Sequence, residues 1–183
     1  FFFKQKTAYE IYQCDWSSDV CSSDLKGSSA KIRDTRKTTP LLREFEKFAV
    51  RMGGGTNHRL SLSDAALIKD NHVYAAGGVA KAFSAVKAKY PDIALEVEVD
   101  SLEQLKEVVA AGAELVLLDN MSLEQCRAAV EIVAGKTKLE ASGGLTLENA
   151  HAYAKTGVDY LAVGALTHSA PVMDIGLDFR TEK

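Results

Sequence analysis

The sequence has few of the residues that build disulfide-rich, proline-rich or membrane-spanning proteins. Its 183 residues include three Cys, three Pro and one Trp. No apolar run approaches the roughly 18 residues that a membrane-spanning helix needs. Lys4 and Lys6 interrupt the only hydrophobic run near the start, which argues against a signal peptide. Cys126 is the one thiol beyond residue 25, as is typical of a reducing compartment, so we expect a cytoplasmic protein.

The chain also lacks a large excess of either positive or negative charge. The formal net charge is −3, with 26% charged and 46% hydrophobic residues. A mildly acidic chain gives no support for nucleic-acid binding or for attraction to a membrane surface. The composition instead predicts one globular domain with enough apolar residues to form a core.

Residues 1–25 differ from the rest of the chain. They contain Trp16, Cys14, Cys21 and three consecutive Phe, and they show neither helical nor strand periodicity. The segment resembles translated sequencing-adaptor sequence. We therefore predict a non-native leader over 1–25 and a domain over 26–183, with a natural cysteine-containing extension as the alternative.

From residue 30 onward, short apolar runs alternate with amphipathic segments, which predicts a parallel α/β fold. Pro40 suits the first turn of a helix, and its inward face should carry Leu42, Phe45 and Ala49. Further helices are expected over 78–90, from Ser101, from Ser122 and over 146–155. Expected strands are Lys31–Thr35, Ala65–Lys69, Ile93–Val99, Glu114–Asp119, Thr137–Ser142 and Tyr160–Gly164.

The strand alternation places carboxylates on the side opposite the apolar side chains. In Ile93–Val99, Glu96 and Glu98 share one face and the aliphatic residues share the other. In Thr137–Ser142, Glu140 lies on the same face as Lys138 and Ser142. Helices cover one face only, so the charged face must line a lumen. Six such units predict a partial (β/α) TIM-like barrel, shorter than the roughly 250 residues of a complete one.

Barrel enzymes place their active sites at the carboxyl ends of the strands. Every expected strand here ends in a polar or glycine residue, which a purely structural barrel would not need. These strand-end residues are Arg36, Lys37, Lys69, Glu98, Asp119, Ser142, Gly143, Gly144 and Gly164, with His168 just beyond.

The chemistry of these residues leaves alternatives open. Glu98 and Asp119 end adjacent strands and could share Mg²⁺, or each could pair with a neighbouring lysine. A Ser-Gly-Gly turn before a helix is a candidate phosphate site, although such turns are often only structural. Lys69 could bind anions or form a Schiff base, as in aldolases. His58 and His168 are ambiguous by themselves.

Seven motifs together carry a resemblance to a known family. They are DTRKTTP (34–40), GGGTNHR (53–59), LIKDNH (67–72), LEVEV (95–99), LLDNM (117–121), LEASGG (139–144) and VGALTHSAP (163–171). In this order and spacing, from about Lys31 to Phe179, the chain resembles the quinolinate phosphoribosyltransferase family. Leu41 and Ser61 stand where that family more often has Gly, which puts the local loop shape in doubt.

The resemblance implies an incomplete barrel preceded by an N-terminal sandwich domain, which this chain does not show. It also implies transfer of phosphoribosyl from phosphoribosyl pyrophosphate to quinolinate, with Mg²⁺ as cofactor and a homodimer or dimer-based hexamer as assembly. The implied catalytic residues are Lys37, Lys69, Glu98 and Asp119, of which Glu98 and Asp119 hold the metal. The implied substrate-binding set adds Thr35, Arg36, His58, Arg59, Glu140, Ser142, Gly143, Gly144, Gly164 and His168.

Two alternatives differ in function. One is a relative of the same fold that uses another acceptor, of the kind associated with molybdate transport. The other is a phosphosugar aldolase or isomerase that uses Lys69. Because one domain of the implied enzyme is absent from the chain, we expect the chain alone to be inactive.

Overall fold

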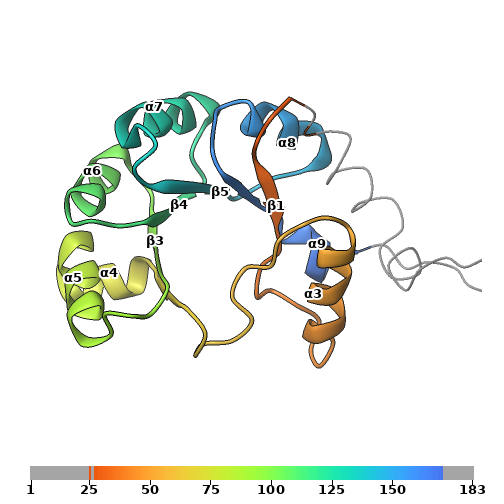
Figure 1. Ribbon diagram of the computed structural model, residues 1–183, viewed down its shortest axis with the longest axis horizontal. Helices are drawn as coiled ribbons and strands as arrows, with labels where there is room; N and C mark the ends of the chain where they lie inside the picture. Colours follow the sequence, from red (N-terminus) through yellow and green to blue (C-terminus); the bar gives the residue numbers. More distant parts are fainter. Residues whose placement is uncertain (1–24, 26, 171–183) are drawn as a thin grey trace, which may run out of the picture.

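The structure is a computed structural model that describes residues 25 and 27–170. Six parallel strands form one curved sheet in the order β1-β6-β5-β4-β3-β2 (Figure 1). The strands are β1 (Lys31–Arg33), β2 (Ala66–Ile68), β3 (Leu95–Val99), β4 (Leu115–Asp119), β5 (Lys138–Ser142) and β6 (Tyr160–Ala162). The predicted α/β barrel architecture with about six parallel strands is confirmed.

Helices lie on the outer side of the sheet, and Figure 1 shows them as an arc around the strands. Each long helix follows a strand; α5 and α6 pack against β3, α7 against β5 and α8 against β6, whereas α3 packs against α9. Ser101 and Ser122 cap their helices through Oγ as predicted. The helices are α3 (Arg43–Met52), α4 (Asp70–Ala76), α5 (Val79–Lys89), α6 (Leu102–Ala110), α7 (Leu123–Val133), α8 (Leu147–Ala154) and α9 (Ala165–His168).

The barrel is open between its first two strands. β1 pairs only with β6 and β2 pairs only with β3, so both are edge strands. Residues 53–65, which connect α3 to β2, pass through this opening, and Thr56 forms an isolated parallel bridge with Arg33. A loop therefore covers the exposed backbone of β1, as unpaired strand edges generally require.

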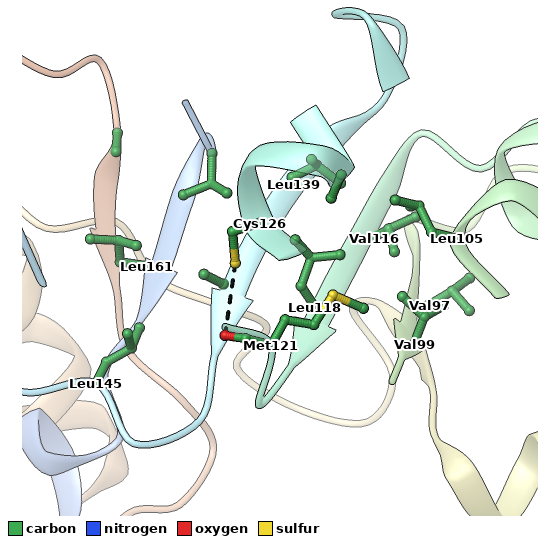
Figure 2. Packing of buried hydrophobic residues seen from close by; sticks show 14 of the residues in the cluster. Val97, Val99, Leu105, Val116, Leu118, Met121, Cys126, Leu139, Leu145 and Leu161 are labelled. Carbon is green, nitrogen blue, oxygen red and sulfur yellow. Dashed lines mark hydrogen bonds between the residues drawn. The ribbon is translucent and has the colours of Figure 1, made fainter. Parts of the chain in front are cut away.

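The apolar core lies between the sheet and the helices (Figure 2). Val97, Val116, Leu118 and Leu139 point from the strands toward this layer, where Leu105 of α6 meets them. Burying a side chain of this size contributes roughly 1.5–3 kcal/mol each. The lumen side carries Glu96, Glu98, Glu140 and Ser142 on β3 and β5, as predicted for these two strands, but on β4 it also carries Leu115 and Leu117, the register partners of Glu96 and Glu98.

One helix was not predicted and another differs from its prediction. Residues 70–76 form helix α4, whereas the sequence analysis assigned no element between the strand 65–69 and the helix 78–90. In α3, the inward face holds Ala49 as predicted, but Phe45 is 65% exposed and Leu42 is 37% exposed. The buried positions of α3 include Glu46 and Lys47, which bind polar groups of the neighbouring loops, beside Val50, which belongs to the apolar core.

The proposed leader over 1–25 lies almost wholly outside the described residues. Its last residue, Leu25, is buried in the core cluster, and its carbonyl accepts a hydrogen bond from Ser28 N–H at 2.9 Å. The origin of the preceding residues stays a prediction. Among the described residues, no helix is long and apolar enough to cross a membrane.

Candidate active site

The sheet register brings the predicted strand-end residues to one edge of the barrel. Glu98 and Leu117 are register partners in β3 and β4, and Asp119 is the partner of Ser142 across β4 and β5. Ser142 in turn is paired with Ala162, two residues before Gly164. The carboxylates, the Ser-Gly-Gly turn and the β6 turn therefore occupy the same end of adjacent strands.

The two basic segments at the barrel opening are held together by a buried ion pair that sequence reasoning missed. Asp34 is fully buried and its Oδ1 lies 2.5 Å from Lys47 Nζ. The same oxygen accepts the His58 backbone N–H at 2.8 Å, and Lys47 Nζ also donates to the His58 carbonyl at 3.0 Å. These buried contacts thus hold the two basic segments, which include residues 35–37 and 58–59, next to one another.

His58 points into the lumen rather than out of it. Its Nδ1 accepts the backbone N–H of Arg59 at 2.8 Å, so this nitrogen carries no proton. Its Nε2 lies 2.8 Å from Glu96 Oε2 and 3.7 Å from Glu140 Oε1. The geometry fits a neutral ring that donates from Nε2 to Glu96. Both ring nitrogens are engaged by the protein, which favours a positioning role over direct contact with a ligand.

His58, Glu96 and Glu140 are a group of metal-ligand type, with ligand atoms within 4.8 Å of one another. The hydrogen-bond pattern opposes a metal there. A metal-bound histidine usually donates its second ring N–H to an acceptor, whereas Nδ1 of His58 faces a donor. Arg33 Nη1 already neutralises Glu140 at 2.5 Å. We therefore assign this group to a charge network and not to a metal centre.

Glu140 is the most perturbed acid of this network. Burial, and secondarily the nearby charge of Glu96, raise the pKa of Glu140 to about 7, while Arg33 and His58 pull it down. Glu96 Oε1 and Glu140 Oε1 have no hydrogen-bond partner among the described residues. The lumen therefore holds an acid that changes charge near neutral pH.

Arg36 and Arg59 place two guanidinium groups near each other at the barrel opening. Burial lowers the pKa of Arg59, and the like charge of Arg36 lowers it further, against Glu96 and Asp64, which raise it. Arg59 Nη1 donates to the Ala65 carbonyl at 3.2 Å, and Arg36 Nε is buried without a partner in the described part of the chain. Neighbouring cations with spare donors form a place for an anion.

Lys69 forms an ion pair with Glu98 Oε2. The alternative in which these carboxylates pair with lysines is therefore realised for Glu98. A carboxylate partner stabilises the charged ammonium, whereas a Schiff base requires the neutral amine. This contact disfavours the aldolase alternative and leaves Lys69 suited to anion binding.

Asp119 is held by the residue that follows it. Asn120 Nδ2 donates to Asp119 Oδ2 at 2.9 Å, and Asn120 N–H donates to the Ser142 carbonyl at 2.9 Å. A Cβ at Gly143 would lie 2.1 Å from Asn120 Oδ1, and Gly143 has φ +98°. Glycine is required at 143, and Asn120 connects the Asp119 carboxylate to the Ser142–Gly144 turn.

The β6 turn is built similarly. A Cβ at Gly164 would lie 2.9 Å from His168 Nε2, so glycine there leaves room for the ring. His168 Nδ1 is hydrogen-bonded to Ser169 Oγ at 2.7 Å. Thr167 Oγ1 donates to the Lys37 carbonyl at 2.7 Å, and Thr35 Oγ1 accepts Lys37 N–H at 3.1 Å. These contacts fix the backbone around Lys37 against α9.

The structure thus gathers the predicted residues at one end of the barrel, except that Glu140 lies deeper, within the lumen. The residues that hold them were not singled out from the sequence. Glu96 had a visible signal, because it alternates with apolar residues in β3. Asp34 and Lys47 had none, since a lone acid in a loop and a lone lysine in a helix are usually solvent-exposed. The residues added by the structure are Arg33, Asp34, Lys47, Glu96 and Asn120.

Comparisons with known proteins identify the family. Residues 18–178 match the family described as "Quinolinate phosphoribosyl transferase, C-terminal domain". The chain is 60% identical over 157 residues to the nicotinate-nucleotide pyrophosphorylase [carboxylating] of Mycobacterium leprae, covering 84% of this chain and 55% of the relative.

Solved structures agree with this result. The nicotinate-nucleotide pyrophosphorylase from Francisella tularensis is 41% identical, with a TM-score of 0.84 over 91% of this chain and 57% of that one. NadC from Streptococcus pyogenes is 45% identical, with a TM-score of 0.81 over 86% of this chain and 56% of that one. The chain spans about half the length of the curated relatives that it matches. The chain therefore belongs to the quinolinate phosphoribosyl transferase C-terminal domain family.

Proposed function

We propose that the protein takes part in transferring a phosphoribosyl group from phosphoribosyl pyrophosphate to quinolinate, yielding nicotinate mononucleotide, CO₂ and pyrophosphate in NAD biosynthesis. The observation that carries the proposal is the pair of basic segments, 35–37 and 58–59, drawn together at the barrel opening beside carboxylates and glycine turns. The names of the relatives agree with this chemistry.

In this proposal the acceptor is bound by cations. The guanidinium groups of Arg36 and Arg59 pair with the two carboxylates of quinolinate, with Lys37 and Lys69 nearby. Each charge-assisted hydrogen bond contributes about 1.5–3 kcal/mol. Fixed positive charges also orient the pyridine nitrogen toward the ribose, which lowers the entropic part of the barrier.

The donor is bound by the later strands. The turn at Ser142, Gly143 and Gly144, the β6 turn at Gly164, and His168 provide backbone and side-chain donors for phosphate groups. Negative charge that develops on departing pyrophosphate is met by these groups. The pyridine nitrogen forms the bond to the anomeric carbon as the bond to pyrophosphate breaks. The positive charge of the resulting pyridinium stabilises the electron pair that CO₂ leaves on the adjacent ring carbon, which then takes a proton from water, so no organic cofactor is needed.

Mg²⁺ is part of the proposal. Glu98 and Asp119 would hold it, and their chemistry fits, because two carboxylates end neighbouring strands at one edge and Mg²⁺ commonly takes one or two protein carboxylates. When bound, the ion would neutralise pyrophosphate charge. Lys69 competes for Glu98, so we expect binding of the ion to be accompanied by release of that ion pair.

We further propose that the protein acts as a homodimer, or a dimer-based hexamer, in the cytoplasm. Support for assembly comes from an exposed apolar stripe on α3, formed by Phe45, Phe48 and Met52 at helical spacing, with the exposed Leu41 just before the helix. Large exposed apolar patches usually mark interfaces, and we assign this one to a second copy of the protein. The buried free thiol of Cys126 is compatible with a reducing compartment.

The test of the function is a pyrophosphate-release assay with quinolinate and phosphoribosyl pyrophosphate. It compares this chain with a chimera in which the N-terminal part of the Mycobacterium leprae relative precedes it. We expect turnover by the chimera and little or none by the chain alone, because an open site leaves its charges in high dielectric. A folded chimera without turnover would contradict the proposed function.

The metal assignment is tested by Glu98→Gln and Asp119→Asn in the same chimera. Each should lower Mg²⁺-dependent turnover by roughly 10²-fold or more, by loss of charge partners for the transition state. Each should also weaken Mn²⁺ binding, measured by water proton relaxation without substrate. Glu103→Gln, on the outer helix α6, serves as the control. Unchanged Mn²⁺ binding in both variants would remove these carboxylates from the metal site.

A further inference from the structure

We infer that Asp34 and Lys47 are positioning residues, whose buried pair sets the distance and orientation between the two anion-binding segments 35–37 and 58–59. The ligand in this inference rests on the proposed function. Neither side chain can touch substrate, because Asp34 and Lys47 are 0% and 1% exposed. They act through the loops that they join.

The contacts of Asp34 bring the two segments together. Asp34 immediately precedes Thr35 and ends the run that begins in β1. Its Oδ1 accepts the backbone N–H of His58 at 2.8 Å, and its Oδ2 accepts Asn57 Nδ2 at 2.5 Å. A single carboxylate therefore fixes the backbone just before Arg59 relative to the backbone just before Thr35.

Lys47 completes the junction from helix α3. Its Nζ contacts Asp34 Oδ1 at 2.5 Å and donates to the His58 carbonyl at 3.0 Å, while its own carbonyl accepts Asn57 Nδ2 at 2.9 Å. Both backbone polar groups of His58 are thus bound by the pair. Burial lowers the pKa of Lys47, and Asp34 opposes that shift. A buried charge pair of this kind is retained at a desolvation cost, which points to a role other than stability.

The junction is needed because the sheet does not supply one. β1 and β2 are opposite edges of the sheet, so no ladder sets the spacing between the segment after β1 and the loop before β2. The isolated Arg33–Thr56 bridge ends just before His58. The guanidinium groups of Arg36 and Arg59 on these segments repel each other. The buried Asp34–Lys47 pair holds the two segments in place, so that both groups can bind one dianion.

The experiment uses the double variant Asp34→Asn/Lys47→Met in the full 183-residue chain, because removing one partner leaves an unpaired buried charge. The single variants should lose more thermal stability than the double one. In the double variant, His58 O loses its donor and Asn57 Nδ2 faces an amide donor, so the loop loosens. Thr137→Val is the matched control, since Thr137 is buried and donates to Ala113 O at 2.8 Å at the opposite end of β5.

Three measurements are made on each folded variant. Quinolinate affinity, from an NMR titration, should fall roughly ten-fold or more in the double variant and stay within two-fold in the control. Affinity for inorganic pyrophosphate should stay within two-fold in both, because its groups belong to the later strands. Amide hydrogen exchange at His58 and Arg59 should accelerate only in the double variant.

The outcomes separate the two claims. If the double variant lost affinity for quinolinate and for pyrophosphate equally, the whole site would be disturbed and the inference would be overturned. Unchanged quinolinate affinity in the double variant would also overturn it. If neither the unmodified chain nor the chimera binds quinolinate, the proposed ligand fails, and exchange at His58 and Arg59 decides the inference alone. Unchanged exchange in the double variant overturns it in every case.

Discussion

At the residue level, the lumen of this barrel is occupied by charged groups where complete barrels commonly pack aliphatic side chains. Arg33, Glu140, His58 and Glu96 form a buried series in which cationic or donor groups alternate with carboxylates. Burial first, and then the nearby charge of Glu96, raise the pKa of Glu140 to about 7 against the opposing charge of Arg33.

This raised pKa predicts a pH-dependent stability. The ordinary glutamate pKa is 4.5 and the folded value is higher, so the folded state binds more protons between these two values. Stability from Glu140 is fully present below about pH 4.5 and is lost as the pH rises to about 7, by at most about 3 kcal/mol. Urea unfolding at pH 5 and pH 8 should show this decrease.

Glu140→Gln should flatten that dependence, although Arg33 then loses its partner and absolute stability falls. The exposed Glu131→Gln serves as the control and should keep the pH dependence of the unmodified chain. If Glu140→Gln retained the full decrease between pH 5 and pH 8, the titrating group would lie elsewhere.

A second residue-level prediction concerns Gly143. Gly143→Ala should lower the free energy of unfolding by about 2 kcal/mol more than Gly144→Ala, because its Cβ would overlap Asn120. Both glycines have positive φ, but Gly144 has open space around it, so its variant measures backbone strain alone. Urea denaturation gives both values.

The double variant Asn120→Ala/Gly143→Ala should recover part of the loss, because it removes the overlapping amide. Equal stability of Gly143→Ala and Gly144→Ala would show that Asn120 moves away at no cost. That result would weaken its assigned role in holding Asp119 against the Ser142–Gly144 turn.

At the level of elements, α3 buries two charged residues beside Ala49 and Val50 and leaves its largest apolar side chains exposed. Glu46 and Lys47 are buried, and Glu46 accepts Thr39 N–H at 3.1 Å, while Phe45 and Met52 are at least half exposed. The helix begins after Leu41, which has φ +68° and is 98% exposed. An L residue other than Asn or Asp rarely adopts this conformation.

Leu41→Gly should therefore stabilise the protein. Relief of the left-handed conformation is worth about 1–2 kcal/mol, against about 0.5–1 kcal/mol for the added freedom of glycine in the unfolded chain. We expect a net gain of about 0.5–1 kcal/mol in urea unfolding. Leu42→Gly is the control and should destabilise, since Leu42 has φ −102°, which an L residue adopts without strain. A loss of stability in Leu41→Gly would contradict the strain argument.

At the level of the whole molecule, the open barrel presents the α3 stripe on the side where the loop 53–65 closes the sheet. Leu60 and Leu62 of that loop are also 52% and 71% exposed. The proposed second copy would cover the stripe.

This arrangement predicts self-association. Sedimentation velocity should show concentration-dependent oligomers of the unmodified chain. The variant Phe45→Glu/Met52→Glu should be monomeric, because burying two charges in an apolar interface has a large desolvation cost. Tyr74→Glu is the control, since Tyr74 is an exposed aromatic on α4 away from the stripe. A monomeric unmodified chain at high concentration would refute the proposed interface.

The strand and helix pattern, the parallel order and the strand-end position of the site were determined by the sequence alone. Alternation in Leu95–Val99 set the two faces of β3, and the motifs placed Lys69, Glu98 and Asp119 at strand ends, because period and turn chemistry are local properties. Serine caps at 101 and 122 were equally local. The family resemblance rested on the same short segments.

Only the tertiary structure decided which face of α3 is buried and how the two basic segments meet. Asp34, Lys47 and His58 lie 11 to 24 residues apart, and their contacts depend on the opening between β1 and β2, which no local pattern encodes. A buried charge looks like a surface charge in sequence, because its cost is offset by partners distant in the chain. The tautomer of His58 was settled in the same way, by one backbone donor and two carboxylates that meet only in the folded lumen.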